Sequence, residues 1–598
     1  MDVTVSAAAT TTSLSWLGRT FTFSEPVEFG YFPVRGDPYF VHPGGDGPQI
    51  TLSSPAWDGT GGGVRHGAMI DPDPALASIQ GAVWQGYDSR MEGYNAANNV
   101  ALLPYIQMSP GECLCAAESN LPNQAAKPGG GNGTVILEMA LLHCLADHPS
   151  VPCFAPPYCK VSGTKALVPL STVNHSLSPN LTRPVGPATP TATLDITGRM
   201  VRPLYDVGFH TLSRSQMRPL NAFQGQIYPT NGAMAHVTVN LVHSLYNTAT
   251  SNTMRERICQ AALDYYALLP NCANSFSTGA GYGPVCLTIV LYGGMFMEDE
   301  DMLAVGDMTI TPDLNGSKKF GEQQQWYYHE DAWDGYLWPK PREEYPLGPP
   351  LFGDEKIATG DHHSSRNLAI QETEQEFVYD AYPYATPAIG VFEYELPPLM
   401  ENAGGYMAAA GRTITGCVLV SRVLGLQEYW KADATFDWVT RWLHDANRMA
   451  GYGGVSTPDL HVFGGTVIAT SNNYVSNFWY NYAPGRPTLS GQSGAATGST
   501  TATGSVTTDT DDGEVYAVVT LLPTKPFPLM VLIGQNLHGV AQTAHKWSGS
   551  TGHITTSGVK TFNATGLLPS TNYYFHFMHF REGAFSAVVT SSMFTTTA

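Results

Sequence analysis

The apolar pattern of this 598-residue chain changes twice along its length, and these changes constrain the fold more than any single motif does. From Thr4 to about Phe40, apolar and polar residues alternate as they do in strands. Helical spacing begins near Thr230, and short alternating runs return after Tyr482. Because the chain also exceeds the length of one compact core, the sequence predicts a multidomain α+β protein.

We predict three domains from these changes. Residues 1–204 are expected to form a β-rich region with long loops, in which residues 100–103 and 166–170 are short strands. Residues 205–482 are predicted to form a domain of helical hairpins, and an α/α toroid is our interpretation of how the hairpins are arranged. Residues 487–598 carry short strand patterns separated by turns, which predict a β-sandwich.

Helix-start signals support the middle domain. Thr230 can cap a first helix, and Thr253-x-x-Glu256 forms a capping box that predicts the start of a second one. Pro270 is expected to stop this second helix. A third apolar run extends over residues 285–297.

The segment from Glu322 to Arg366 holds most of the unusual side chains, with three Trp, four Tyr and three His among several carboxylates. Pro and Gly break any long helix or strand there, so we expect a loop. Aromatic rings cover the apolar face of a sugar while polar groups bond its hydroxyls, and the segment therefore predicts a sugar-binding cleft. The open alternative is an aromatic loop that fills a core. The predicted substrate-binding residues are Trp326, Tyr328, Trp333, Tyr336 and Trp338, together with Gln224 outside the loop.

The same loop carries groups that suit two kinds of polysaccharide cleavage. Glu330 and Asp334 are candidates for the paired acids of a glycoside hydrolase. His329, His363 and Arg366 could supply the base and the cation of a lyase that acts on uronates. Such side chains on loops are usually solvated, so catalysis remains one hypothesis among others.

Composition narrows the range of partners. Only 13% of the residues are charged, and the formal net charge of −20 argues against nucleic acid as a partner. We expect no membrane insertion, because no apolar window is long enough to span a bilayer, and no signal peptide is recognisable at the N-terminus. The nine cysteines show no zinc-site spacing. We therefore predict structural thiols or a local disulfide, with no metal and no cofactor.

A motif near the C-terminus, Leu567-x-Pro569-x-Thr571-x-Tyr573, resembles the corner of fibronectin type III domains, in which the Tyr hydroxyl bonds back to the preceding turn. The wider region resembles a fibronectin type III-like terminal module of tail and other virion proteins of phages and prophages. The residues that carry this resemblance are Val515–Val519, Ile533–Asn536, Thr565–Leu567 and Ser586–Thr596. The sequence departs from this family at Arg581–Phe585, and the resemblance does not extend to residues 1–480. The resemblance implies a place on a virion and a role in display or in weak attachment to sugars.

Three functions remain open on these grounds. The leading hypothesis is a virion-associated, tail-fibre or spike-like bacteriophage protein that binds host cell-surface polysaccharide. It would assemble as a homo-oligomer with other virion proteins. A second hypothesis is a polysaccharide-degrading enzyme, either a lyase or a glycoside hydrolase, with its cleft at residues 322–366. The third is a purely structural capsid, fibre or decoration protein.

Overall fold

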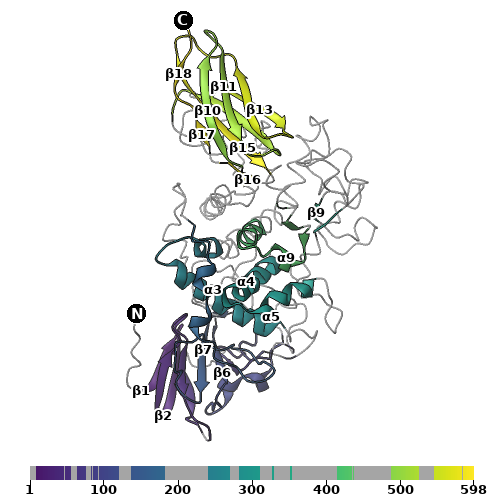
Figure 1. The fold of residues 1–598 in the computed structure, drawn as a ribbon. Helices are drawn as coiled ribbons and strands as arrows, with labels where there is room; N and C mark the ends of the chain where they lie inside the picture. The colour runs from purple at the N-terminus through teal and green to yellow at the C-terminus, as the bar shows by residue number, and fades with distance from the viewer. Residues whose placement is uncertain are drawn as a thin grey trace. The chain divides into compact units, whose positions relative to one another are not determined.

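The computed structural model shows a mixed α/β protein with β-rich N- and C-terminal regions and a helical middle (Figure 1), which confirms the predicted order of these regions. The described residues fall into two compact units. The first contains the N-terminal sheet and helices α3 to α5, and the second contains the C-terminal sheets. The described residues are 9–45, 47–54, 63–73, 75, 83, 85–91, 93–119, 136–181, 240–269, 282–309, 326–328, 350–352, 414–433, 435–436, 439, 487–523, 545–581, 584–586 and 588–598.

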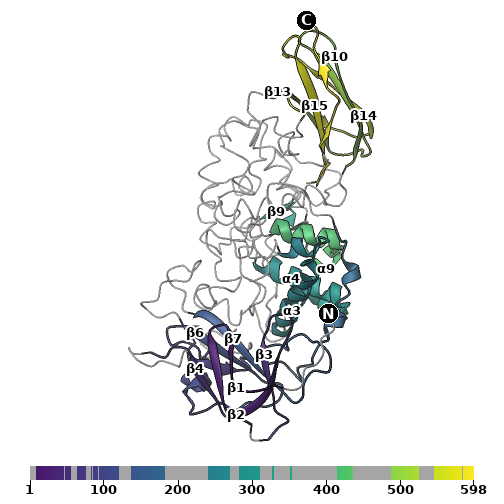
Figure 2. The same cartoon turned by 90° about the vertical axis from the view of Figure 1, so that its left-hand side faces the viewer.

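The N-terminal sheet of the described chain has seven strands in the order β1-β2-β3-β7-β6-β5, with β4 also pairing with β2. Strands β1 to β4, β6 and β7 lie together in Figure 2. Strands β3 and β7 run parallel, and the other pairs are antiparallel. The bounds are β1 (Thr10–Trp16), β2 (Arg19–Tyr31), β3 (Pro38–Val41), β4 (Ile50–Ser54), β5 (Ala68–Ile70), β6 (Cys113–Ser119) and β7 (Ile136–Leu145).

The alternation seen in the sequence builds this sheet. Phe21 and Phe23 of β2 are buried in the core, while their neighbours along the strand are more exposed. The β1–β2 turn consists of Leu17 and Gly18, which both have positive φ (43° and 80°), as a tight hairpin of this twist requires. Pro26 lies in a stretch of β2 that pairs with neither β1 nor β4, so its missing N–H costs no ladder bond.

The helices of the middle region are α3 (Ser251–Leu268), α4 (Tyr282–Met297), α5 (Glu300–Leu303) and α9 (Gln427–Trp430). The 3₁₀ helices are η2 (Ala96–Asn98), η3 (Val100–Leu102), η4 (Leu170–Thr172), η5 (His175–Leu177) and η7 (Ala304–Thr309). Helices α3 and α4 pack closely where Gly293 of α4 faces Ala262 of α3. A Cβ added at Gly293 would lie only 2.3 Å from the Cβ of Ala262. Helix α4 contains the apolar run at residues 285–297. No helix in the described part of the chain is long and apolar enough to span a membrane.

Three local predictions were wrong. Helix α3 begins at Ser251 after Thr250, so Thr253 lies inside it and the predicted capping box does not mark its start. Residues 100–102 form η3 and not a strand, because the side chain of Asn99 accepts the N–H of Ala101 and caps the turn. Residues 166–170 are not a strand either, and within them Pro169 makes an isolated bridge to Cys153.

The C-terminal region consists of two antiparallel sheets that share one hydrophobic core. One sheet has the order β10-β11-β14, and the other has the order β13-β12-β15, with three short segments pairing along β15. The bounds are β10 (Leu489–Ala496), β11 (Ala502–Thr508), β12 (Glu514–Thr520), β13 (His545–His553), β14 (Gly558–Ala564), β15 (Asn572–Arg581), β16 (Ala584–Phe585), β17 (Val589–Thr590) and β18 (Phe594–Thr595). Phe562 of the first sheet and Phe575 and Phe577 of the second meet in this core.

Candidate functional site

Most of the side chains predicted to form the sugar cleft lie outside the described residues. Trp326 and Tyr328 belong to β8 (Trp326–Tyr328), which pairs antiparallel with β9 (Pro350–Phe352). The remaining candidates are outside the described part: Gln224, His329, Glu330, Trp333, Asp334, Tyr336, Trp338, His363 and Arg366. The cleft and its chemistry therefore remain predictions, as do the domain boundaries near residues 204 and 482.

A buried cluster of charged groups joins the N-terminal sheet to helix α3. The guanidinium of Arg35, between β2 and β3, donates to the carboxylates of Asp37 (2.6 Å, Nη2 to Oδ2) and of Asp264 on α3. His143 on β7 adds a second cation, with its Nε2 3.6 Å from Oδ2 of Asp37. All four side chains are at most 2% exposed.

The pKa values within this cluster follow from burial and pairing. Burial would lower the pKa of His143, but contacts with Cys113 and Asp37 outweigh it and raise the pKa to about 9. Burial also raises the pKa of Asp264 to about 6, since Arg35 offsets only part of the desolvation. Asp37 touches both cations, and although burial works against ionisation, these contacts keep its pKa below the ordinary value.

The arrangement around His143 superficially resembles a Cys-His-Asp relay, because the Sγ of Cys113 lies 3.9 Å from the Nε2 of His143. A relay needs the nucleophile and the orienting carboxylate on opposite ring nitrogens, whereas here both face Nε2. Burial raises the pKa of Cys113 well above its usual range, so the thiol stays protonated. The cluster is therefore structural, and it also buries Arg35 and Asp37 of an Arg-Gly-Asp triplet that could otherwise suggest adhesion.

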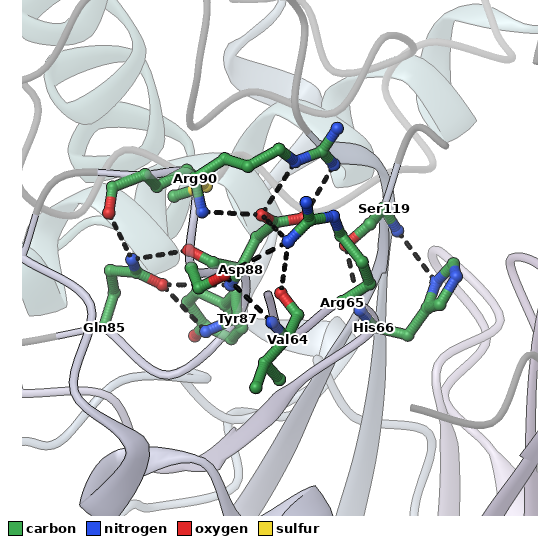
Figure 3. A network of polar contacts seen from close by, with 10 residues as sticks. Val64, Arg65, His66, Gln85, Tyr87, Asp88, Arg90 and Ser119 are labelled. Carbon is green, nitrogen blue, oxygen red and sulfur yellow. Dashed lines mark hydrogen bonds and ion pairs between the residues drawn. The ribbon is translucent and has the colours of Figure 1, made fainter. Parts of the chain in front are cut away.

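A second polar network surrounds Asp88 in the loop before η2 (Figure 3). Arg90 matches the Asp88 carboxylate with two bonds, from Nε to Oδ1 (2.9 Å) and from Nη2 to Oδ2 (2.8 Å). Arg65 approaches the same carboxylate at 3.4 Å through Nη1, which also donates to the carbonyl oxygen of Val64 and to the hydroxyl of Ser89. The carboxylate is fully buried, whereas the side chains of Arg65 and Arg90 are 13% and 29% exposed.

Polar and close backbone contacts hold this loop against its neighbours. The amide of Gln85 donates to the carbonyl oxygens of Asp88 (3.0 Å) and Met91 (3.1 Å). A Cβ added at Gly67 would lie 2.0 Å from the carbonyl oxygen of Gly86, so the two segments touch backbone to backbone. These contacts tie the described residues of the loop to their neighbours, and the sequence offered no recognised motif that could have identified the network.

The cysteines play no part in a metal site or disulfide within the described chain. Eight of the nine cysteines are described, all eight are buried, and none of them forms a disulfide with another of the eight. No group of three or more His, Cys, Asp or Glu residues among those described is placed to hold a metal ion.

The outer face of the β10-β11-β14 sheet is polar and almost uncharged. Strands β10 and β11 contain no Asp, Glu, Lys or Arg. The hydroxyls of Ser493 and Ser505 bond to each other (2.7 Å), and the hydroxyl of Thr503 donates to Oδ1 of Asn563 (3.0 Å). Thr561 lies beside Ser505 in register, so the face presents adjacent hydroxyl and amide groups.

Comparison with known proteins gives only weak structural likeness. Neither a known family model nor a curated protein matches the chain. Among solved structures, the chicken CNTN1 FN1–FN3 domains match with 11% sequence identity, 19% coverage of this chain, 32% coverage of that chain and a TM-score of 0.13. The chain thus spans about a third of the length of that structure. The match is too weak to carry an argument about function.

Proposed function

We propose that this protein is a virion-associated, tail-fibre or spike-like attachment protein of a bacteriophage that binds host cell-surface polysaccharide. In this proposal the C-terminal sheets form a fibronectin type III-like module. The helical middle would form a toroid-like wall, with residues 322–366 lining its cleft. The chain would act as a homo-oligomer together with other virion proteins.

The C-terminal strand order supports the fibronectin type III-like assignment. Three strands face a larger sheet whose last strand is broken into β16, β17 and β18. The hydroxyl of Tyr573, at the start of β15, accepts the backbone N–H of Leu568 at 2.8 Å. This is the corner contact that the motif at residues 567–573 predicts, and it ties the turn to the strand that follows.

The uncharged outer face of the β10-β11-β14 sheet is the observation that carries the proposal. Hydroxyl and amide groups can both donate and accept hydrogen bonds, as the hydroxyls of a sugar also do. Thr561 and Asn563 are exposed on β14 and lie next to the hydroxyls of β11. A face of this chemistry suits a neutral or weakly charged glycan without the steering that a basic patch would need.

Binding of the intact chain to a glycan array and to whole bacterial cells tests the proposal. We expect binding, and we expect it to weaken in the double variant Thr561→Val and Asn563→Val, which keeps the strand but removes its polar groups. Thr51→Val, on a strand of the N-terminal sheet, is the matched control and should bind as the unmodified chain does. Unchanged binding in the double variant would show that this face does not bind the glycan.

Two other outcomes separate the alternatives. Reducing ends or unsaturated uronate released from polysaccharide would identify an enzyme acting through residues 322–366. A protein found in particles that binds neither glycans nor cells would be a structural or decoration protein. Absence from particles together with absence of glycan binding would refute the proposal.

A further inference from the structure

The guanidinium of Arg65 in the Asp88 loop is held from one side only. Its Nη1 bonds the carbonyl oxygen of Val64 (3.0 Å) and the hydroxyl of Ser89 (3.1 Å), and it lies 3.4 Å from Oδ1 of Asp88. Its Nε and Nη2 bond to no described residue. The side chain is 13% exposed, so most of it is fixed in the protein.

Asp88 is already matched by another cation. Arg90 binds both of its carboxylate oxygens, and the backbone N–H of Arg90 also donates to Oδ1 (2.9 Å). Arg65 is therefore a second cation beside a carboxylate that has its own bidentate partner (Figure 3). A cation that is mostly removed from water but not needed by its neighbour is costly, unless it has another use.

The geometry points to a binding site for a carboxylate, such as that of a sugar acid, at the Nε–Nη2 edge of Arg65. This edge presents two parallel N–H groups, which match the two oxygens of a carboxylate in a bidentate contact. The contacts of Nη1 fix the guanidinium before the ligand arrives, so binding loses little side-chain entropy. The chain has a formal net charge of −20 and repels anions on the whole, so a local cation is needed to attract a carboxylate ligand.

Isothermal titration calorimetry of the intact chain with D-glucuronate at low ionic strength tests this site. D-glucose is the neutral control ligand, and sulfate is the tetrahedral anion for comparison. We expect saturable binding of glucuronate, none of glucose, and weaker binding of sulfate. Arg65→Lys keeps the charge but loses the bidentate edge, and it should weaken glucuronate binding about tenfold or more.

Lys160→Gln serves as the matched control, because it removes one positive charge from an exposed position that pairs with Asp73. It should bind glucuronate as the unmodified chain does. Absence of saturable glucuronate binding, equal affinity in Arg65→Lys, or sulfate binding as tight as that of glucuronate would each overturn the assignment. The site does not depend on the proposed function, since a chain that binds glucuronate but no host polysaccharide would keep the site and lose the function.

Discussion

The two charged clusters of the N-terminal unit differ in burial and in charge balance. Around Arg35, two cations and two carboxylates are buried together and the charges balance. Around Asp88, one fully buried carboxylate meets two guanidinium groups that are partly exposed. The first cluster connects residues 229 positions apart in sequence, whereas the second is built mostly within one loop.

The difference separates a structural role from a binding role. The charges of the Arg35 cluster balance, although each of its four side chains keeps one buried polar atom without a hydrogen-bond partner. Breaking such a buried set leaves unpaired charge in the interior. A cluster whose carboxylate is already matched can offer its second guanidinium to solvent at little cost to the fold. We therefore expect substitutions in the Arg35 cluster to change stability, and substitutions at Arg65 to change ligand binding.

The largest effect is expected from Arg35→Met, which leaves the carboxylates of Asp37 and Asp264 buried without their shared cation. Loss of one partner from a buried ion pair costs about 3–5 kcal/mol of unfolding free energy. Urea or guanidinium denaturation of the intact chain measures this loss. A loss of unfolding free energy below about 1 kcal/mol would mean that the Arg35 cluster contributes no more than an ordinary surface ion pair. The two clusters would then not differ in their effect on stability.

Gly67→Ala should destabilise the Asp88 loop, because its new Cβ would meet the carbonyl oxygens of Gly86 (2.0 Å) and Tyr87 (2.8 Å). Backbone atoms cannot rotate away, and overpacking of this kind costs about 1–3 kcal/mol. Gly63→Ala is the matched control, since its Cβ meets only the side-chain ends of Ser89 and Arg65. Equal denaturation midpoints for the two variants would show that the loop is not held rigidly.

Stability should fall as the pH rises above neutrality because of His143. Its folded pKa of about 9 lies above the ordinary 6.5, so its contribution is complete below pH 6.5 and is lost as the pH rises through 9. The folded pKa of Asp264, about 6, also lies above its ordinary 3.8, so this group lowers stability as the pH rises from about 4 to 6, which is below this window. The slope is at most about 1.4 kcal/mol per pH unit. Denaturation midpoints between pH 7 and 10 should lose this slope in His143→Gln, and an unchanged slope would assign it to other groups.

Arg65→Gln should have the smallest effect on stability, below about 1 kcal/mol, because Asp88 keeps its bidentate contact with Arg90. Thermal or chemical denaturation of this variant beside Arg35→Met gives the direct contrast between the clusters. A loss as large as that of Arg35→Met would make Arg65 a structural residue.

Sequence patterns predicted those parts of the fold that depend on local periodicity. Helix α4 was recognisable because a long apolar run of this kind is buried on nearly every side. The strands at Val515 and Tyr573 followed from short runs of apolar and aromatic residues, and the corner contact of Tyr573 followed from its motif. The error at residues 100–103 shows the limit, because a short apolar run does not distinguish a strand from a 3₁₀ turn capped by Asn99.

The charged clusters could not be predicted, because they depend on contacts between distant segments. Nothing near Arg35 in the sequence indicates that its partner is Asp264 on α3. Arg65 and Asp88 come from two segments that touch where Gly67, which has no Cβ, packs against the carbonyl oxygen of Gly86. The aromatic candidates at residues 329–366 remain predictions from composition.

Binding of the intact chain to purified surface polysaccharides of candidate host bacteria, followed by biolayer interferometry, tests the central claim most directly. The proposal predicts saturable binding to at least one polysaccharide, competed by free fragments of the same polymer and reduced in the double variant Thr561→Val and Asn563→Val. Absence of saturable binding to every polysaccharide of such a panel would contradict it.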